Sequence, residues 1–201
     1  MTSTIAVVTA GLGRPSTTRL LADRLAEATD RALRLRDEEV HVEVVELREL
    51  AHDITDNLLT GFPGTDLAAA IRTVAGADAV VAVTPVFSAS YSGLFKSFFD
   101  VLEDGALEGK PVLIAATAGT ARHSLVLEFA VRPLFAYLGA TVAPTGVFGA
   151  TEDFGSTASG ALADRVDRAA RELAGLVVGR PSGDAPDPFD NPTPFAELLG
   201  G

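Results

Sequence analysis

The chain has 201 residues, no cysteine and a formal net charge of −11. These values exclude a disulfide framework, thiolate catalysis and a cysteine-based metal site, and they argue against general nucleic-acid binding. Hydrophobic residues make up 47 % of the chain, and no apolar run reaches the roughly 18 residues that a membrane-spanning helix needs. The N-terminal stretch MTSTIAVVTAG has no basic region before its apolar residues, so we expect a strand there and no signal peptide. We therefore expect a cytoplasmic protein with a large core.

Apolar runs rich in β-branched residues alternate with helical patterns along the chain. Such alternation predicts right-handed crossovers and an α/β fold whose parallel sheet is covered on both faces. The second run, HVEVVEL, alternates polar and apolar residues as an edge strand does, which favours the 2-1-3-4-5 order of a flavodoxin-like three-layer sandwich. Ligands of such sheets bind at the carboxyl ends of the strands. We expect strands at 4–10, 40–47, 78–84, 110–117 and 140–148, and helices at about 16–36, 64–76, 91–104, 122–138 and 157–179.

We predict a single domain over residues 1–179, followed by a proline-rich tail over residues 180–201. The tail holds five of the chain's eleven prolines, which prevents a helix or an inner strand over most of its length. Two interpretations stay open. The tail is either a disordered or surface-draped end, or an arm that docks on a neighbouring subunit or partner through Phe189, Phe195, Leu198 and Leu199.

Three segments of this acidic chain contain cations and no carboxylate: residues 1–22, 84–99 and 109–127. Each segment includes the loop after one of the central predicted strands. An anionic ligand approached by all three loops would explain this distribution, although apolar strands account for part of it. The cations are Arg14, Arg19, Lys96, Lys110 and Arg122.

The loop after the first strand, AGLGRPSTTRLL, has the composition of a phosphate site. Gly11 and Gly13 allow a tight turn, Pro15 suits the start of a helix, and three hydroxyl residues occupy its first turn. The loop lacks the Gly-Lys-Ser/Thr of a Walker loop, the third glycine of a dinucleotide fingerprint, and the carboxylates of a phospho-acceptor domain. A helix that is merely capped by Ser or Thr is the alternative. The candidate phosphate ligands are Gly11, Arg14, Ser16, Thr17 and Thr18.

The loops after the third and fourth strands offer small side chains, one aromatic ring and accessible backbone groups. This chemistry suits the rim of a flat heterocycle with alternating donors and acceptors, such as the isoalloxazine of a flavin. The candidate ring ligands are Pro85, Val86, Phe87, Ser88, Ala89 and Ser90 in one loop, and Thr117, Ala118, Gly119 and Thr120 in the other.

The stretch TPVFSASYSGLFKSFFDVLEDGALEGKPVLIAATAGTARHSLVLEFAVRPLFAYLGA resembles the NAD(P)H-dependent FMN reductase family. It is most similar to the reductases that supply reduced flavin to two-component monooxygenases such as the alkanesulfonate system. The match runs from about residue 4 to 154 and includes P-x-[FY]-x-x-S-[FY]-S-G-x-x-K-x-x-x-D and G-T-x-x-H. The resemblance implies FMN and NAD(P)H as cofactors. It also implies that Ser16, Thr17 and Thr18 bind the FMN phosphate, that 85–90 and 117–120 bind the ring and ribityl chain, and that His123 lies near the same pocket.

Hydride transfer from nicotinamide to flavin requires stacked rings and no protein acid or base, so we predict no catalytic side chain. The first hypothesis is an NAD(P)H-dependent FMN reductase that releases reduced FMN to a flavin-dependent monooxygenase. One alternative is an enzyme that keeps FMN bound and reduces quinones or azo compounds. Another is a flavodoxin-type electron carrier, which the lack of tryptophan and of an aromatic residue in the third loop disfavours. The sequence leaves NADPH and NADH both open.

Two aromatic segments predict subunit contacts. Leu94, Phe95, Phe98, Phe99 and Leu102 form a stripe at helical spacing that is broad for one sheet face, while Lys96 and Asp100 are expected to fix the helix or a subunit contact. In the second segment Pro133 removes a helical hydrogen bond and predicts a kink or bulge near Phe129, a position that is tyrosine in some members of the family. We expect helices 91–103 and 122–138 to form a dimer or tetramer interface beside the flavin. The second segment contributes Phe129, Phe135 and Tyr137.

Overall fold

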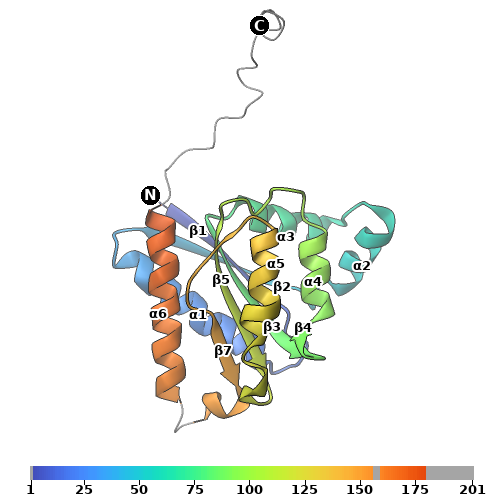
Figure 1. Cartoon of the computed structure of the whole chain (residues 1–201). Helices are drawn as coiled ribbons and strands as arrows, with labels where there is room; N and C mark the ends of the chain where they lie inside the picture. The colour runs from blue at the N-terminus through green and yellow to red at the C-terminus, as the bar shows by residue number, and fades with distance from the viewer. Residues whose placement is uncertain (1, 156–158, 180–201) are drawn as a thin grey trace, which may run out of the picture.

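A computed structural model describes residues 2–155 and 159–179 (Figure 1). The two interpretations of the proline-rich tail therefore concern residues outside the described part. Five parallel strand positions form the central sheet, in the order β2-β1-β3-β5 followed by β6 and β7. This order is 2-1-3-4-5 when β6 and β7 are counted as one position, and it confirms the expected flavodoxin-like sheet. The strands are β1 (Thr2–Thr9), β2 (Glu39–Glu46), β3 (Ala79–Phe87), β4 (Ser90–Tyr91), β5 (Pro111–Ala118), β6 (Thr141–Val142) and β7 (Val147–Ala150).

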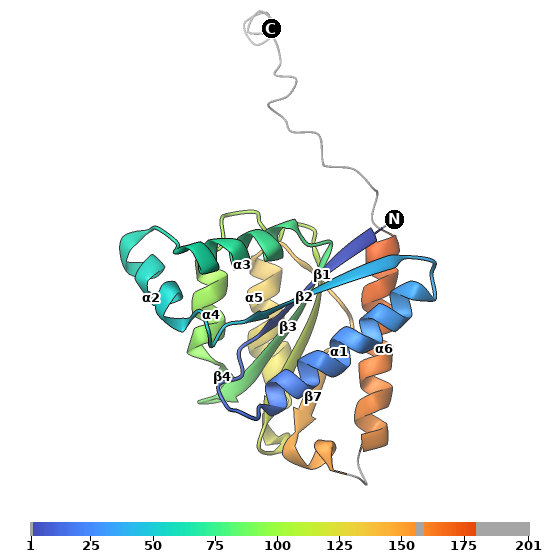
Figure 2. The same cartoon turned by 180° about the vertical axis from the view of Figure 1, so that it is seen from behind.

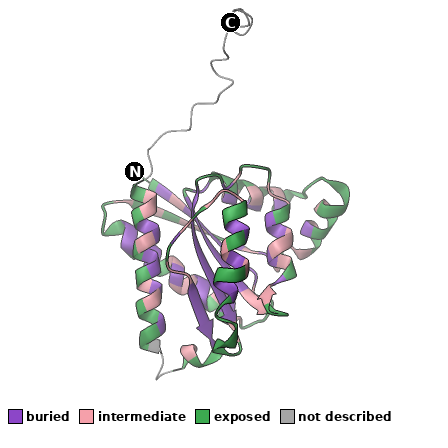
Figure 3. Ribbon diagram, viewed as in Figure 1, coloured by how far each residue is buried: buried purple, intermediate pink, exposed green. Residues whose placement is uncertain are grey.

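Helices cover both faces of the sheet. On one face α1 (Thr17–Arg34) and α6 (Ser159–Val178) pack side by side (Figure 2). The other face carries α2 (Ala51–Thr60), α3 (Thr65–Gly76), α4 (Gly93–Asp100) and α5 (Arg132–Tyr137). The inner strands are buried along nearly their whole length (Figure 3), as expected of a parallel sheet between two helical layers. None of the described helices is long and apolar enough to cross a membrane.

The aromatic stripe of α4 belongs to the core of this chain. Phe95, Phe98 and Phe99 are buried, and Phe99 lies against Phe95 and Phe135 with ring centroids 4.8 and 4.9 Å apart. These rings fill the layer between α4, α5 and the sheet. The number of aromatic residues in the stripe therefore gives no support for a subunit interface, contrary to the argument from the sequence.

The bulge expected near Phe129 is present. Residues Leu127–Val131 form a π-helical turn that leads directly into α5. Pro133 lies in the first turn of α5 and has no N–H to donate to a carbonyl of the preceding turn. A π-helical turn, which is wider than an α-helical one, often accommodates the loss of such a backbone hydrogen bond. It places Phe129 on the surface, with 78 % of the side chain exposed.

Candidate active site

Four chain segments meet at the carboxyl edge of the sheet. The strand register sets this arrangement, because Thr9 of β1 lies beside Val83 of β3, Pro85 of β3 lies beside Thr117 of β5, and the end of β5 pairs with the end of β7. The loop after β1, the hairpin after β3, the loop after β5 and the 3-10 turn Thr151–Phe154 after β7 therefore share one edge. The sequence predicted the first three of these, and it did not point to the fourth.

The loop after β1 ends in a helix terminus with open donors. Ser16 caps α1, and its hydroxyl accepts the amide of Arg19 at 3.2 Å. Leu20 donates to the carbonyl of Ser16 at 3.0 Å. The amides of Thr17 and Thr18 have no acceptor within residues 2–155 and 159–179. Open amides at the positive end of a helix dipole attract an anion.

Gly11 allows this loop to close tightly. A Cβ on Gly11 would stand 2.1 Å from the hydroxyl oxygen of Ser16 and 3.1 Å from Cβ of Thr18. No side chain fits there unless the capping serine moves. Pro15 precedes the cap and is not part of α1, so its expected place at the start of the helix is off by two residues.

The three hydroxyl residues have different environments. The side chain of Thr17 is exposed and has no hydrogen-bond partner among the residues that the structure describes. Thr18 is buried, and its Oγ1 lies 2.8 Å from Oγ1 of Thr117, which is also buried. Thr9, at the end of β1, has a buried hydroxyl oxygen without a partner in the described segments. The sequence gave no reason to select Thr9, because a threonine that ends an apolar strand is unremarkable.

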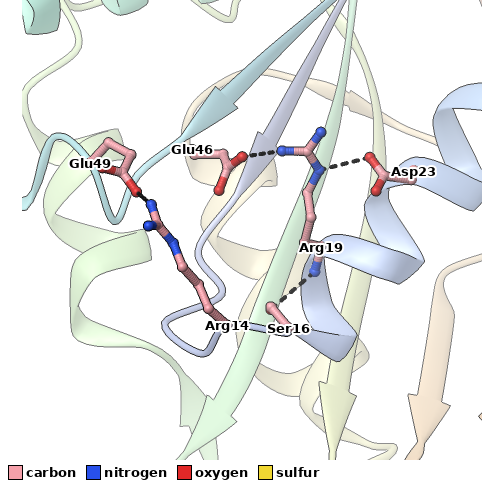
Figure 4. A network of polar contacts seen from close by, with 6 residues as sticks. All are labelled: Arg14, Ser16, Arg19, Asp23, Glu46 and Glu49. Atoms are coloured by element: carbon pink, nitrogen blue, oxygen red, sulfur yellow. Dashed lines mark hydrogen bonds and ion pairs between the residues drawn. The ribbon is translucent and has the colours of Figure 1, made fainter.

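The two arginines of the first acid-free segment are paired with carboxylates from neighbouring elements (Figure 4). Arg14 pairs with Glu49. Arg19 donates to Asp23 at 2.7 Å and also pairs with Glu46. These contacts raise the pKa of Arg19, chiefly through the hydrogen bond to Asp23.

Arg14 remains at the mouth of the loop, because 70 % of its side chain is exposed. Arg122 and His123, in the 3-10 turn Ala121–His123 after β5, are also exposed, and neither side chain has a hydrogen-bond or ion-pair partner within residues 2–155 and 159–179. Arg14, Arg122 and His123 thus lie at the rim of the expected site, whereas Lys110 is buried at the opposite edge of the sheet.

The loop after β3 is a tight hairpin. β3 continues to Phe87 and pairs with the two-residue strand β4, so that only Ser88 and Ala89 form the turn. Both turn residues have positive φ angles, 48° and 65°, a conformation uncommon for residues other than glycine. Thr84 holds the base of the hairpin, since its hydroxyl accepts the amide of Ser92 at 3.0 Å and donates to the carbonyl of Pro85 at 2.9 Å.

The candidate ring ligands differ in exposure. Pro85, Val86, Ser90 and Ala118 are half-buried, whereas Phe87, Ser88, Ala89, Gly119 and Thr120 are exposed. Thr117 is the one buried member of the group. The two loops therefore expose backbone and small side chains to solvent at their tips and are fixed to the sheet at their bases.

A groove of about 570 Å³ lies beside this edge, between α4 and the π-helical turn with α5. It includes Tyr91, Phe129 and Tyr137 among its lining residues. Lys96 and Asp100 line it as well and form an ion pair one helical turn apart, which is consistent with the role in fixing the helix that the sequence suggested.

Arg132 of α5 donates to Glu128 of the π-helical turn at 2.6 Å, and this hydrogen bond lowers the pKa of the Glu128 carboxyl.

Comparison with known proteins gives the same fold and a defined activity. Residues 3–155 match the model of the NADPH-dependent FMN reductase family. An FMN reductase (NADPH) of Pseudomonas aeruginosa is 35 % identical over 88 % of this chain and 93 % of its own length. An NADH-dependent FMN reductase of Pseudomonas putida is 35 % identical over 86 % of this chain and 91 % of its own.

A solved structure shows the same relationship. An oxidoreductase from Corynebacterium diphtheriae is 49 % identical and superimposes with a TM-score of 0.86, over 89 % of this chain and 98 % of that one. The matched region contains all four segments of the carboxyl edge described above. The chain therefore belongs to the NADPH-dependent FMN reductase family and is an NAD(P)H:FMN oxidoreductase.

Proposed function

We propose that this protein, acting in the cytoplasm, reduces FMN with NAD(P)H and releases reduced FMN to a flavin-dependent monooxygenase. The observation that carries the proposal is the pair of open amides on Thr17 and Thr18 at the start of α1. They lie beside two loops that expose backbone groups at the same edge of the sheet. FMN has a phosphate for the first feature and a flat ring for the other two.

The first loop fits a terminal phosphate. The open amides, the exposed hydroxyl of Thr17 and the positive end of α1 supply donors and charge, and Gly11 leaves the space that the turn requires. Ser16 keeps the helix capped while the ligand approaches, and Arg14 can share its guanidinium between Glu49 and the phosphate. Bound FMN would supply the electron-accepting ring, and the protein would supply position.

The ring would lie across the hairpin 85–90 and the loop 117–120, with His123 near its edge. The rigid base of each loop supports this placement. Thr84 ties the hairpin to Ser92, and the ladder of β3 and β5 joins the two loops at Pro85 and Thr117. Two rings stacked on such a platform need no acid or base from the protein.

Release of reduced flavin is supported by the exposure of the ring loops. Phe87 is 46 % exposed, and Ser88, Ala89, Gly119 and Thr120 are all exposed. A site with open walls favours exchange of the flavin with solvent. An enzyme that keeps its flavin would need more of the ring surface covered, either within the chain or by a second subunit.

We also propose that the groove between α4 and α5 forms part of a dimer or tetramer interface. Phe129 and Tyr137 are 78 % and 89 % exposed, and Leu125 is exposed beside the same π-helical turn. Phe129→Glu should turn the assembly into monomers in sedimentation experiments. Leu59→Glu, at an equally exposed apolar residue of α2, is the control and should leave the assembly intact. A wild-type protein that is a stable monomer and still binds FMN would contradict this part.

The activity is tested by mixing the purified protein with NADPH or NADH in air, with and without added FMN. Oxidation that requires added FMN and saturates with it is the expected result. The protein should then support a flavin-dependent monooxygenase that cannot use NAD(P)H itself. A protein that stays yellow through gel filtration, ignores added FMN and reduces quinones would overturn the proposal in favour of a quinone or azo reductase. A yellow protein that NAD(P)H does not reduce would indicate an electron carrier.

A further inference from the structure

We infer that the hydroxyl pair Thr18–Thr117 couples recognition of the flavin phosphate to the position of the loop that holds the flavin ring. The inference rests on the proposed function and assigns these two residues a positioning role. Its consequence is a preference for FMN over riboflavin that exceeds what the phosphate contacts alone would give.

The pair joins elements that are far apart in sequence. Thr18 is the second residue of α1 and Thr117 is the penultimate residue of β5. Their Oγ1 atoms are 2.8 Å apart, 99 positions separate them in the sequence, and both side chains are only 3 % exposed. In such a buried setting a hydrogen bond is strong, and leaving either hydroxyl without a partner is costly. The two residues therefore move together.

Each member of the pair belongs to a different part of the flavin site. The backbone amide of Thr18 is one of the two open donors at the start of α1. Thr117 lies two residues before the exposed loop residues Gly119 and Thr120, and it is paired with Pro85 at the start of the β3 hairpin. A phosphate that fixes Thr18 through its amide would also fix Thr117 through its side chain. The loop after β5 begins at Thr117, and the hairpin after β3 begins at Pro85, its strand partner.

The effect is reciprocal. If a phosphate on α1 favours one position of the loop after β5, a ring held by that loop favours the arrangement of α1 that binds phosphate. FMN engages both ends of this connection, whereas riboflavin engages only the ring end. The hydroxyl pair should therefore contribute to the binding of FMN and contribute little to the binding of riboflavin.

The test is a fluorescence titration with FMN and with riboflavin for the wild type, Thr18→Val, Thr117→Val and the double variant. Valine keeps the shape of threonine and removes the hydroxyl. We expect each single variant to weaken FMN binding about fivefold more than riboflavin binding, the value of one lost hydrogen bond. The double variant should be no weaker than the single ones, because both changes break the same bond.

Two further variants separate positioning from a structural effect. Thr117→Ser retains the hydroxyl and should keep the FMN preference of the wild type. Thr73→Val loses a side-chain hydrogen bond to Glu43, 2.8 Å long, on α3 away from the flavin edge, and should change the affinity for neither flavin. Circular dichroism and thermal unfolding establish that each variant is folded.

The outcomes are distinct. Equal weakening of FMN and riboflavin, additive effects in the double variant, or no effect on either flavin would overturn the coupling while the proposed function stands. Failure of the wild type to bind FMN at all would overturn the proposed function itself.

Discussion

The two edges of the sheet differ in whether their polar groups have hydrogen-bond partners within the chain. At the amino edge Lys110 is buried and donates to the carbonyls of Ala75, at 2.8 Å, and Ala77, at the end of α3. Asp78 accepts the amide of Thr4 at 2.8 Å and donates its own amide to the carbonyl of Thr4 at the same distance. The polar groups of Lys110 and Asp78 are thus satisfied within the chain.

At the carboxyl edge several polar groups are left open. The amides of Thr17 and Thr18, the hydroxyl of Thr17 and the buried hydroxyl of Thr9 find no partner in the described part of the protein. Buried or helix-end polar groups without partners are costly for a fold. The open amides of the helix end and the hydroxyl of Thr9 support the proposal that the carboxyl edge binds a ligand, whereas the paired groups of Lys110 and Asp78 stabilise the fold.

Replacement of Lys110 by methionine tests the amino edge and should have the largest effect. Methionine fills similar space and leaves the last carbonyls of α3 without their donor, so we expect a loss of about 3 kcal/mol in the free energy of unfolding. Urea denaturation measures this loss. FMN affinity of the folded variant should not change, because the substitution lies at the opposite edge.

The control is Lys96→Met, which removes an exposed ion pair on α4 and should cost less than about 1 kcal/mol. Similar losses of stability in the two variants would contradict the claim that the amino edge stabilises the fold. A Lys110→Met protein that is stable but binds FMN poorly would contradict it as well.

Gly11→Ala tests the carboxyl edge. The new Cβ would overlap the hydroxyl of Ser16, and relief of the overlap should displace the loop at a cost of about 2 kcal/mol, or roughly thirtyfold in FMN affinity. Gly175→Ala in α6 is the matched control, because a Cβ there meets no atom within 4 Å. It should leave FMN binding unchanged and stabilise the helix slightly. Unchanged FMN affinity in Gly11→Ala would show that the phosphate does not use this turn.

Ser16→Asp separates the two roles of the capping residue. Aspartate caps a helix as well as serine does, so the stability should be retained. Its negative charge would repel a phosphate, and FMN should bind about tenfold more weakly while riboflavin is unaffected. Isothermal titration with the two flavins measures the difference. Equal affinities of wild type and variant for FMN would place the phosphate elsewhere.

The smallest effect concerns the π-helical turn and depends on pH. The pKa of Glu128 is lowered by its hydrogen bond with Arg132. The folded carboxyl therefore titrates below the ordinary value of about 4.3 that it has in the unfolded chain. The pair stabilises the protein above that ordinary value and loses its contribution as the pH falls through the lowered pKa.

Glu128→Gln should accordingly reduce the free energy of unfolding by a few tenths of a kcal/mol near pH 7, because the Glu128 side chain is half exposed and solvent screens the pair. In urea titrations the difference should shrink and then vanish as the pH falls through the lowered pKa of Glu128. A difference that persists at low pH would mean that the residue acts through packing and not through its charge.

The sequence predicted the sheet because its inner strands are apolar over their whole length, a pattern that needs no distant information. It missed α2, where Ile54 is the only buried residue and the periodic signal is correspondingly weak. It joined β6 and β7 into one strand. The gap between them is set by distant side chains, since Arg132 donates to the carbonyl of Ala143 at 3.1 Å and Glu172 accepts the amide of Thr145 at 2.7 Å.

In the candidate site, too, features with a local sequence signal could be predicted, and contacts between distant elements could not. The loops and their order could be predicted, and Pro133 was a sufficient local signal for the π-helical turn. The contact of Thr18 with Thr117 and the pairing of Arg14 with Glu49 could not. They depend on how elements pack, and the residues themselves are ordinary.

Hydrogen exchange with and without FMN tests the central contrast most directly. We predict that FMN slows exchange at the start of α1, in the β3 hairpin and in the loop after β5, and that exchange at 75–78 and 110–112 stays unchanged. Protection confined to the amino edge or to the α1–α6 surface, with none at Thr17 and Thr18, would contradict the assignment of the carboxyl edge as the flavin site.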